Sequence, residues 1–243
     1  MRMPSIIGRE WTTTDGVRLQ NLMLVTTKKI KMTWLEYYRN NYFDLLNPTV
    51  SGAKRGLVEG LYRRADGFNL MFAYLESLAL PEYHIIETGT MRKPGNWKDG
   101  QSARLFSEFV DQHGGTVRSV DIDPTAVATS NTAIPSVNFQ ATCMDSVAWL
   151  QSLTDLDQTD LFYLDSWDVK WNNDHDSATH HLREFQAIEP QLKAGAMIAI
   201  DDNSRFVESG VRTGKGHYIA DYLEAKGILP VYDHYQIIYR WPK

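Results

Sequence analysis

Acidic residues close two short apolar runs in the middle of this 243-residue sequence, and a glycine follows the first of them. Ile85-Ile86 leads into Glu87-Thr88-Gly89, and Ser119-Val120 leads into Asp121. Between the two, residues 102–112 repeat apolar side chains at helical spacing. The pattern is a strand, a glycine turn, a helix and a second strand. In such a unit the glycine lets the backbone approach a ligand, and the acid after the second strand can accept hydrogen bonds from a ribose diol. These residues predict half of a site for a cofactor that contains a nucleoside.

A second set of oxygen donors follows the next two apolar runs. Asp165 ends one run, and Asp201-Asp202-Asn203 follow the other. A parallel sheet would bring them to the same edge as the nucleoside half-site. Oxygen ligands from two neighbouring strand ends suit a hard divalent cation, with magnesium as the default. The alternative is that they only make turns and cap helices. Because crowded carboxylates without a cation would repel one another and raise their pKa values, we favour the metal site.

The elements that carry these residues alternate between strand and helix. After Asp123-Pro124 the pattern predicts helices over residues 126–131, 147–153 and 177–190, and a further helix from Gly214-Lys215-Gly216 to 226. It predicts strands over 137–141, 160–165 and 196–200, and two strands within 228–241. This order predicts an α/β fold with a doubly wound, Rossmann-like, mostly parallel sheet that finishes in a hairpin.

Residues 1–80 precede this alternation and are predicted to form an N-terminal arm and helical cap, whereas residues 81–243 form a single globular domain. Thr33-Trp34-Leu35-Glu36 is a capping box for an aromatic helix that ends before Asn47-Pro48. Two further helices are predicted over 51–64 and 67–78. We expect the aromatic helix to pack against the core; a lid over a planar acceptor is the alternative.

The glycine turn resembles motif I of the class I S-adenosylmethionine (SAM) methyltransferases. Without the polar insertion 91–99, Glu87-Thr88-Gly89-Thr90 followed by Gly100-Gln101-Ser102 is similar to the E-x-G-x-x-x-G-x-S of small-molecule O-methyltransferases related to catechol O-methyltransferase. A nicotinamide site would instead show G-x-G-x-x-G. The resemblance implies a seven-stranded sheet with an antiparallel last strand. It also implies a SAM site that includes Glu87, Gly89, Thr90, Ser102 and Asp121. The insertion is either a surface loop or a flap over the cofactor.

Later segments extend the resemblance. Leu164-Asp165-Ser166-Trp167 and Ala199-Ile200-Asp201-Asp202-Asn203 are similar to the L-D-x-W and A-D-N segments of the catechol-type enzymes. This implies Asp165, Asp202 and Asn203 as metal ligands and Trp167 against the adenine. Macrocin-type sugar O-methyltransferases end the second segment in D-D-Y, which implies Asp165, Asp201 and Asp202 instead.

A pair of residues after the third strand has a further role in the resembling family, where an acidic or small polar pair contacts the adenine. Here that pair is Asp145 and Ser146. Both residue types are also favoured at the start of a helix, so capping is an equal alternative.

The catalytic base departs from the family pattern. The catechol-type enzymes have a lysine three residues after the first metal aspartate, and here Asp168 holds that place. A carboxylate beside a metal is a weak base unless its pKa is raised, so Lys170, His180 and His181 are candidates for the base together with Asp168. The spacing of the histidines does not match H-E-x-x-H, and zinc is not expected.

Composition narrows the class of protein. The net charge is −5 and the sequence has no dense basic run beyond residues 28–31, which argues against a nucleic-acid substrate. The hydrophobic fraction of 43% is sufficient for a full core. One cysteine and the lack of a long apolar segment indicate a cytoplasmic protein with no membrane insertion and no export signal.

The sequence therefore predicts a SAM-dependent and divalent-metal-dependent O-methyltransferase. Its acceptor would be a hydroxyl of a small catechol-like, phenolic or sugar-like molecule, and a homodimer remains open. Two alternatives are a metal-independent SAM methyltransferase and a SAM- or nucleoside-binding module without transferase activity.

Overall fold

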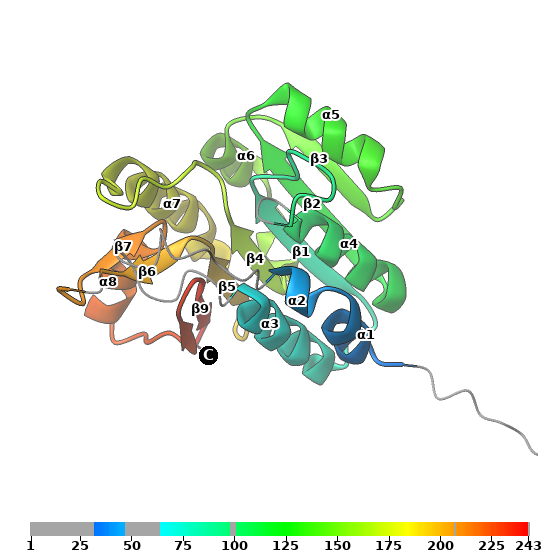
Figure 1. Ribbon diagram of the computed structural model, residues 1–243, viewed down its shortest axis with the longest axis horizontal. Coiled ribbons are helices and arrows are strands. Elements are labelled where there is room, and N and C mark those ends of the chain that lie inside the picture. Colours follow the sequence, from blue (N-terminus) through cyan, green and yellow to red (C-terminus); the bar gives the residue numbers. More distant parts are fainter. Residues whose placement is uncertain (1–31, 47–63, 98–100, 207, 243) are drawn as a thin grey trace, which may run out of the picture. The chain divides into compact units, whose positions relative to one another are not determined.

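The computed structural model describes residues 32–46, 64–97, 101–206 and 208–242, all within the unit Met32–Lys243. Its main sheet has seven strands in the order β3-β2-β1-β4-β5-β9-β8 (Figure 1). The strands are β1 (Tyr83–Thr88), β2 (Gly115–Asp121), β3 (Phe139–Cys143), β4 (Leu161–Leu164), β5 (Met197–Ile200), β8 (Tyr232–Asp233) and β9 (Ile237–Arg240). All pairs among β1 to β5 are parallel, and β9 is antiparallel to β5 and to β8. The predicted α/β fold, mostly parallel with an antiparallel last strand, is confirmed.

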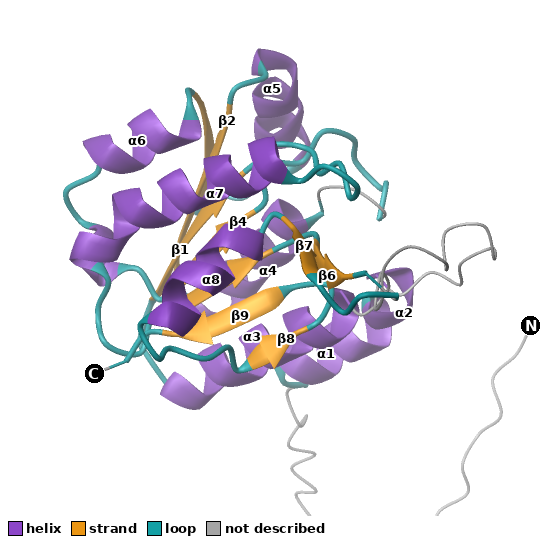
Figure 2. Ribbon diagram, turned by 90° about the vertical axis from the view of Figure 1, so that its left-hand side faces the viewer, coloured by secondary structure: helices purple, strands orange, loops and turns teal. Residues whose placement is uncertain are grey.

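Helices cover both faces of this sheet (Figure 2). They are α1 (Trp34–Asn41), α2 (Phe43–Leu46), α3 (Arg64–Leu78), α4 (Ser102–His113), α5 (Pro124–Ala133), α6 (Ser146–Ser152), α7 (His175–Ile188) and α8 (His217–Ala225), with short 3₁₀ turns at Leu156–Gln158 and Glu189–Gln191. Successive strand residues point to opposite faces. Accordingly, Ile85 belongs to a buried cluster with Phe106 of α4, and Ile86 to a second cluster with Phe185 of α7 and Leu223 of α8. None of the helices described is long and apolar enough to cross a membrane.

The aromatic helix near the start of the described chain packs into the core, as predicted. Its capping box is present, because the Glu36 backbone N–H donates to the Thr33 hydroxyl at 3.2 Å and the Thr33 N–H donates to the Glu36 carboxylate at 3.0 Å. Trp34 and Tyr38 are fully buried in the same cluster as residues of α3 and α4. The predicted single helix to residue 46 is divided into α1 and α2. The helix predicted over 51–64 lies outside the described residues up to residue 63.

A small separate hairpin that the sequence analysis did not anticipate lies between β5 and α8 in the chain. It pairs β6 (Asn203–Arg205) with β7 (Arg212–Gly214). Each strand has only three residues, too few for a periodic signal. The hairpin matters for the site, because β6 follows directly after Asp202 and β7 leads directly into Lys215.

Candidate functional site

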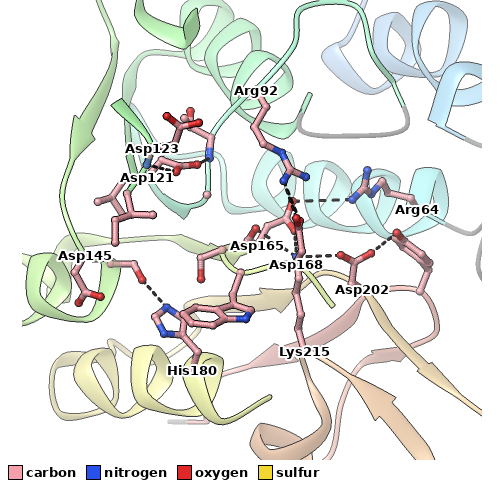
Figure 3. Close-up of a pocket in the computed structure, with 18 residues that line it drawn as sticks. Arg64, Arg92, Asp121, Asp123, Asp145, Asp165, Asp168, His180, Asp202 and Lys215 are labelled. Carbon is pink, nitrogen blue, oxygen red and sulfur yellow. Dashed lines mark hydrogen bonds and ion pairs between the residues drawn. The ribbon is translucent and has the colours of Figure 1, made fainter. Parts of the chain in front are cut away.

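A cavity of about 640 Å³ opens where β1, β2 and β4 end (Figure 3). Its volume is in the range of small-molecule and cofactor sites. Ten residues predicted from the sequence line it: Gly89, Thr90, Asp121, Asp145, Ser146, Asp165, Trp167, Asp168, His180 and Asp202. Eight further residues complete the lining: Arg64, Arg92, Val120, Ile122, Asp123, Ser166, Lys215 and Tyr235. The topology thus brings most of the predicted positions to one place.

One end of the cavity is built by the glycine turn after β1 and the acid at the end of β2. Gly89 has a φ of +80°, and a Cβ there would lie 2.5 Å from the Asp165 carbonyl oxygen, so the turn requires glycine. The Asp121 carboxylate accepts hydrogen bonds from the backbone N–H groups of Thr90 at 3.1 Å and Asp123 at 2.8 Å. Both carboxylate oxygens are thereby fixed, and each keeps a lone pair for a further donor. We call this region, with Asp145, Ser146, Trp167 and His180, the nucleoside end.

Asp145 and Ser146 face the nucleoside end from the start of α6. The Asp145 carboxylate accepts a hydrogen bond from the Ala148 N–H at 2.9 Å, which makes it the N-cap of the helix. Ser146 shares a hydrogen bond of 2.9 Å with Nε2 of His180. Asp145 therefore caps the helix. Because Asp145 and Ser146 also line the cavity, this capping role is compatible with contact to a ligand.

Trp167 forms an exposed aromatic surface at the same end. Its side chain is 57% exposed, its φ is +42°, and its ring lies 5.2 Å from the His180 ring. A large residue with positive φ is unusual and costs backbone energy, which is a common feature of functional sites. An exposed indole held in this way offers a stacking surface for a flat ligand such as adenine.

His180 is held by a buried network rather than left free. Its Nε2 lies 3.3 Å from the Glu184 carboxylate, which also accepts hydrogen bonds from the Thr88 hydroxyl at 3.0 Å and the Ser166 hydroxyl at 2.6 Å. Burial acts to raise the pKa of Glu184, but the neighbouring histidines, His181 first, outweigh it and lower that pKa to about 2. Burial acts to lower the pKa of His180, and Glu184 outweighs this and raises it. Glu184 and Ser146 thus hold the His180 ring in place beside Trp167.

Two residues predicted to bind the cofactor lie away from the cavity lining in the described part of the chain. Glu87 is fully buried in β1 and accepts a hydrogen bond from the Ser119 hydroxyl at 2.7 Å. Burial raises the pKa of Glu87 to about 8, although the hydroxyls of Ser102 and Ser119 act to lower it. Ser102 is buried as the first residue of α4. Both residues are buried near the glycine turn and do not line the cavity.

The other end of the cavity is ionic, and we call it the acidic end. Asp165, Asp201 and Asp202 meet there, with one carboxylate oxygen of each within 4.8 Å of the others. Lys215 lies among them, with its Nζ 2.5 Å from Asp165 Oδ1 and 3.0 Å from Asp202 Oδ2. Arg64 forms an ion pair with Asp201 and approaches Asp165 to 4.0 Å. The structure therefore brings the three predicted aspartates together, but it also brings two basic side chains to them.

These ion pairs shift the pKa values at the acidic end, except that of Asp165, where burial raises the pKa although Lys215 and Arg64 act to lower it. Burial acts to raise the pKa of Asp202, but Lys215 and Arg64 outweigh it and lower that pKa to about 2. Burial also acts to lower the pKa of Lys215, and the two aspartates outweigh it and raise the pKa well above the ordinary value for lysine. Tyr235 donates a hydrogen bond to Asp202, and its ring lies 5.2 Å from the Arg64 guanidinium. The acidic end is a connected network of charged groups.

The remaining predicted residues lie at the margin of the acidic end or outside it. The Asn203 amide donates to the Asp233 carboxylate at 3.0 Å and to the His234 carbonyl at 2.9 Å, and Asn203 does not line the cavity. Asp168 lines the cavity and pairs with Arg92 at 2.9 Å. Lys170 follows in an exposed segment and is absent from the cavity lining.

The acidic end offers oxygen ligands of the type that a divalent cation binds, but these oxygens are already paired with basic side chains. Carboxylate oxygens are suitable ligands for magnesium. However, each of the three aspartates already has a basic partner at 4.0 Å or less. A bound ion would have to displace Lys215 from Asp165 and Asp202.

Sequence reasoning did not identify Arg64, Lys215 and Tyr235 as site residues. Arg64 and Tyr235 are separated from the aspartates they contact by 137 and 33 residues and carry no local motif. The glycines on both sides of Lys215 are a local sequence signal, but the Gly-Lys-Gly pattern predicts only the start of a helix.

Comparison with solved structures identifies the fold. The MycE methyltransferase from the mycinamycin biosynthetic pathway, in complex with Mg and S-adenosylhomocysteine (SAH), aligns with 88% of this chain and 55% of its own length, at 11% sequence identity and a TM-score of 0.52. The described chain has the fold of the SAM-dependent methyltransferases. It spans about half the length of MycE (55%).

A second similar structure is the 1,6-didemethyltoxoflavin-N1-methyltransferase of Burkholderia thailandensis with bound SAH and 1,6-didemethyltoxoflavin. It aligns with 74% of this chain and 84% of its own, at 15% identity and a TM-score of 0.40. No protein-family model and no curated protein sequence matches the chain.

Proposed function

We propose that this chain is a SAM-dependent methyltransferase that methylates a hydroxyl group of a small molecule. The observation that carries the proposal is the nucleoside end of the cavity, where a glycine turn, an anchored carboxylate and an exposed indole face one space with the acidic end beside it. The fold shared with MycE, whose structure contains SAH, supports the choice of cofactor.

In the proposed site the two ribose hydroxyls donate to Asp121, and the adenine lies against Trp167 with its edge toward Asp145 and Ser146. The backbone turn at Gly89 lines the cavity, and in the proposed complex it faces the methionine part of SAM. The nucleoside end therefore directs the sulfonium methyl group toward the acidic end. An acceptor between Arg92, Asp168 and Tyr235 would meet that methyl group.

The proposed reaction is a direct displacement. The acceptor oxygen forms a bond to the methyl carbon while the carbon–sulfur bond breaks, and the electron pair of that bond stays on sulfur to give SAH. The proton on that oxygen becomes strongly acidic as the new bond forms, so that a carboxylate can accept it, and it passes to Asp168, whose side chain is 78% exposed. Most of the acceleration would come from holding the two reactants in line, because a well-oriented pair avoids the entropy of encounter.

A methyl-transfer assay tests this proposal. The purified chain is incubated with SAM carrying a labelled methyl group and a panel of catechols, monophenols and sugars, and both labelled product and SAH are measured. We expect transfer to at least one hydroxylated acceptor and its loss in Asp168→Asn. Binding of SAM without turnover over the panel would favour the nucleoside-binding module, and failure to bind SAM or SAH would refute the proposal.

A further inference from the structure

Lys215 occupies the point at which the three aspartates converge. Its ammonium donates to Asp165 Oδ1 at 2.5 Å, to Asp202 Oδ2 at 3.0 Å and to the Asp165 carbonyl at 3.4 Å, which accounts for all three of its donors. Only 3% of the side chain is exposed. A buried ammonium with acceptors on every proton lies where a bound cation would otherwise be expected.

The backbone around Lys215 is built to bring it there. Gly214 has a φ of +107°, and a Cβ at this position would lie 2.0 Å from the Asp202 carbonyl oxygen, so only glycine permits the approach. A Cβ on Gly216 would lie 2.9 Å from the Asn203 side chain. The Lys215 N–H then donates to the Asp202 carbonyl at 3.0 Å. The Gly-Lys-Gly segment thus packs closely against Asp202 and Asn203, between β5 and β6.

A divalent ion and the lysine would compete for the same oxygens. An ion bound to carboxylates lies about 2.0–2.6 Å from their oxygens. Since the Lys215 Nζ lies 2.5 and 3.0 Å from oxygens of Asp165 and Asp202, it and such an ion would come close together. Two positive charges at such a separation repel each other strongly in a buried site.

Arg64 is the second basic side chain of the cluster. It donates to both oxygens of Asp201, whose side chain is fully buried. Two basic side chains therefore face three carboxylates, which reduces the like-charge repulsion from which a metal was predicted.

We propose that Lys215 takes the place of a divalent cation at the acidic end, so that the chain binds its cofactor and transfers the methyl group without a metal. Lys215 acts as a positioning residue, because it ties the ends of β4 and β5 together and holds Asp165 and Asp202 at the cavity wall. The part of this inference that concerns methyl transfer rests on the proposed function, whereas the occupation of the cation position does not.

Titration with Mn²⁺ alone, followed by electron paramagnetic resonance, tests the inference. We expect no stoichiometric Mn²⁺ binding by the wild-type chain and the same melting temperature with and without millimolar Mg²⁺. In Lys215→Ala the vacated carboxylates should bind one Mn²⁺ at least about tenfold more tightly than the wild type does, and Mg²⁺ should raise the melting temperature.

The control variant is Lys193→Ala, which removes an ion pair of 2.6 Å between the partly exposed Lys193 and the buried Asp160, just before β5 and β4. It should lose stability without gaining a response to Mn²⁺ or Mg²⁺. Stoichiometric Mn²⁺ binding by the wild type that is lost in Asp202→Asn would overturn the inference, and this measurement decides the question even where Lys215→Ala does not fold. A folded Lys215→Ala variant that binds no Mn²⁺ would overturn it as well.

Calorimetric titration with SAH separates the two proposals. A wild-type chain that binds both Mn²⁺ and SAH would overturn the role of Lys215 and leave the proposed function in place. A chain that binds neither would refute the proposed function while the metal result stands.

Discussion

Asp121→Ala removes the carboxylate that is proposed to bind the ribose of the cofactor. The carboxylate is anchored by the backbone N–H groups of Thr90 and Asp123, and in the proposed complex it accepts two hydrogen bonds from ribose. A hydrogen bond to a charged group contributes about 1.5–3 kcal/mol. Loss of two such bonds costs about 3 kcal/mol or more, and since every 1.4 kcal/mol is tenfold in affinity, we expect SAH to bind at least about 100-fold more weakly.

Isothermal titration calorimetry with SAH measures this loss. Asp155→Ala is the matched control, because this aspartate pairs with Arg118 at 3.0 Å and lines a separate depression with His84 and Thr116 near the other end of the sheet. It should bind SAH as the wild type does. A folded Asp121→Ala chain with an SAH affinity within about threefold of wild type would refute the reasoning, whatever its methyltransferase activity.

Three further variants test separate parts of the account. The pKa of Glu87 is raised to about 8 in the folded chain, so the folded chain keeps a proton there that the unfolded chain releases at lower pH. The folded chain therefore loses stability as the pH rises toward 8. Glu87→Gln should therefore raise the melting temperature at pH 9 and change it little at pH 5; equal effects at both would contradict the assignment. Gly89→Ala should destabilise the fold by more than about 1 kcal/mol in urea denaturation, since the new Cβ would lie 2.5 Å from the Asp165 carbonyl, and wild-type stability would argue against the turn. Trp167→Ala should weaken SAH binding by about tenfold with little loss of stability, because the side chain is 57% exposed; unchanged affinity would exclude stacking on adenine.

The position of Gly89 and Asp121 at one edge of the sheet could be predicted from the sequence because its signals are local. An apolar run that ends in Gly89 or Asp121 defines a strand end, and parallel pairing then places both at one edge. The same logic correctly brought Asp165 and Asp202 to that edge, because β4 and β5 are parallel neighbours.

The partners of those aspartates could not be predicted in the same way. Lys215 follows Asp165 by 50 residues and reaches it only because the unanticipated hairpin β6–β7 returns the chain to the sheet. Repulsion among the three carboxylates favours a metal only where no basic side chain enters the cluster, and tertiary packing supplies two, Lys215 and Arg64. The amide of Asn203 likewise found its partners in Asp233 and His234, which belong to a distant segment.

The most direct test of the central claim is a crystal structure of the chain with SAH. The account predicts density for the ribose hydroxyls at Asp121 and for the adenine beside Trp167, in the cavity at the ends of β1, β2 and β4. SAH bound outside that cavity, or with its ribose away from Asp121, would contradict the account.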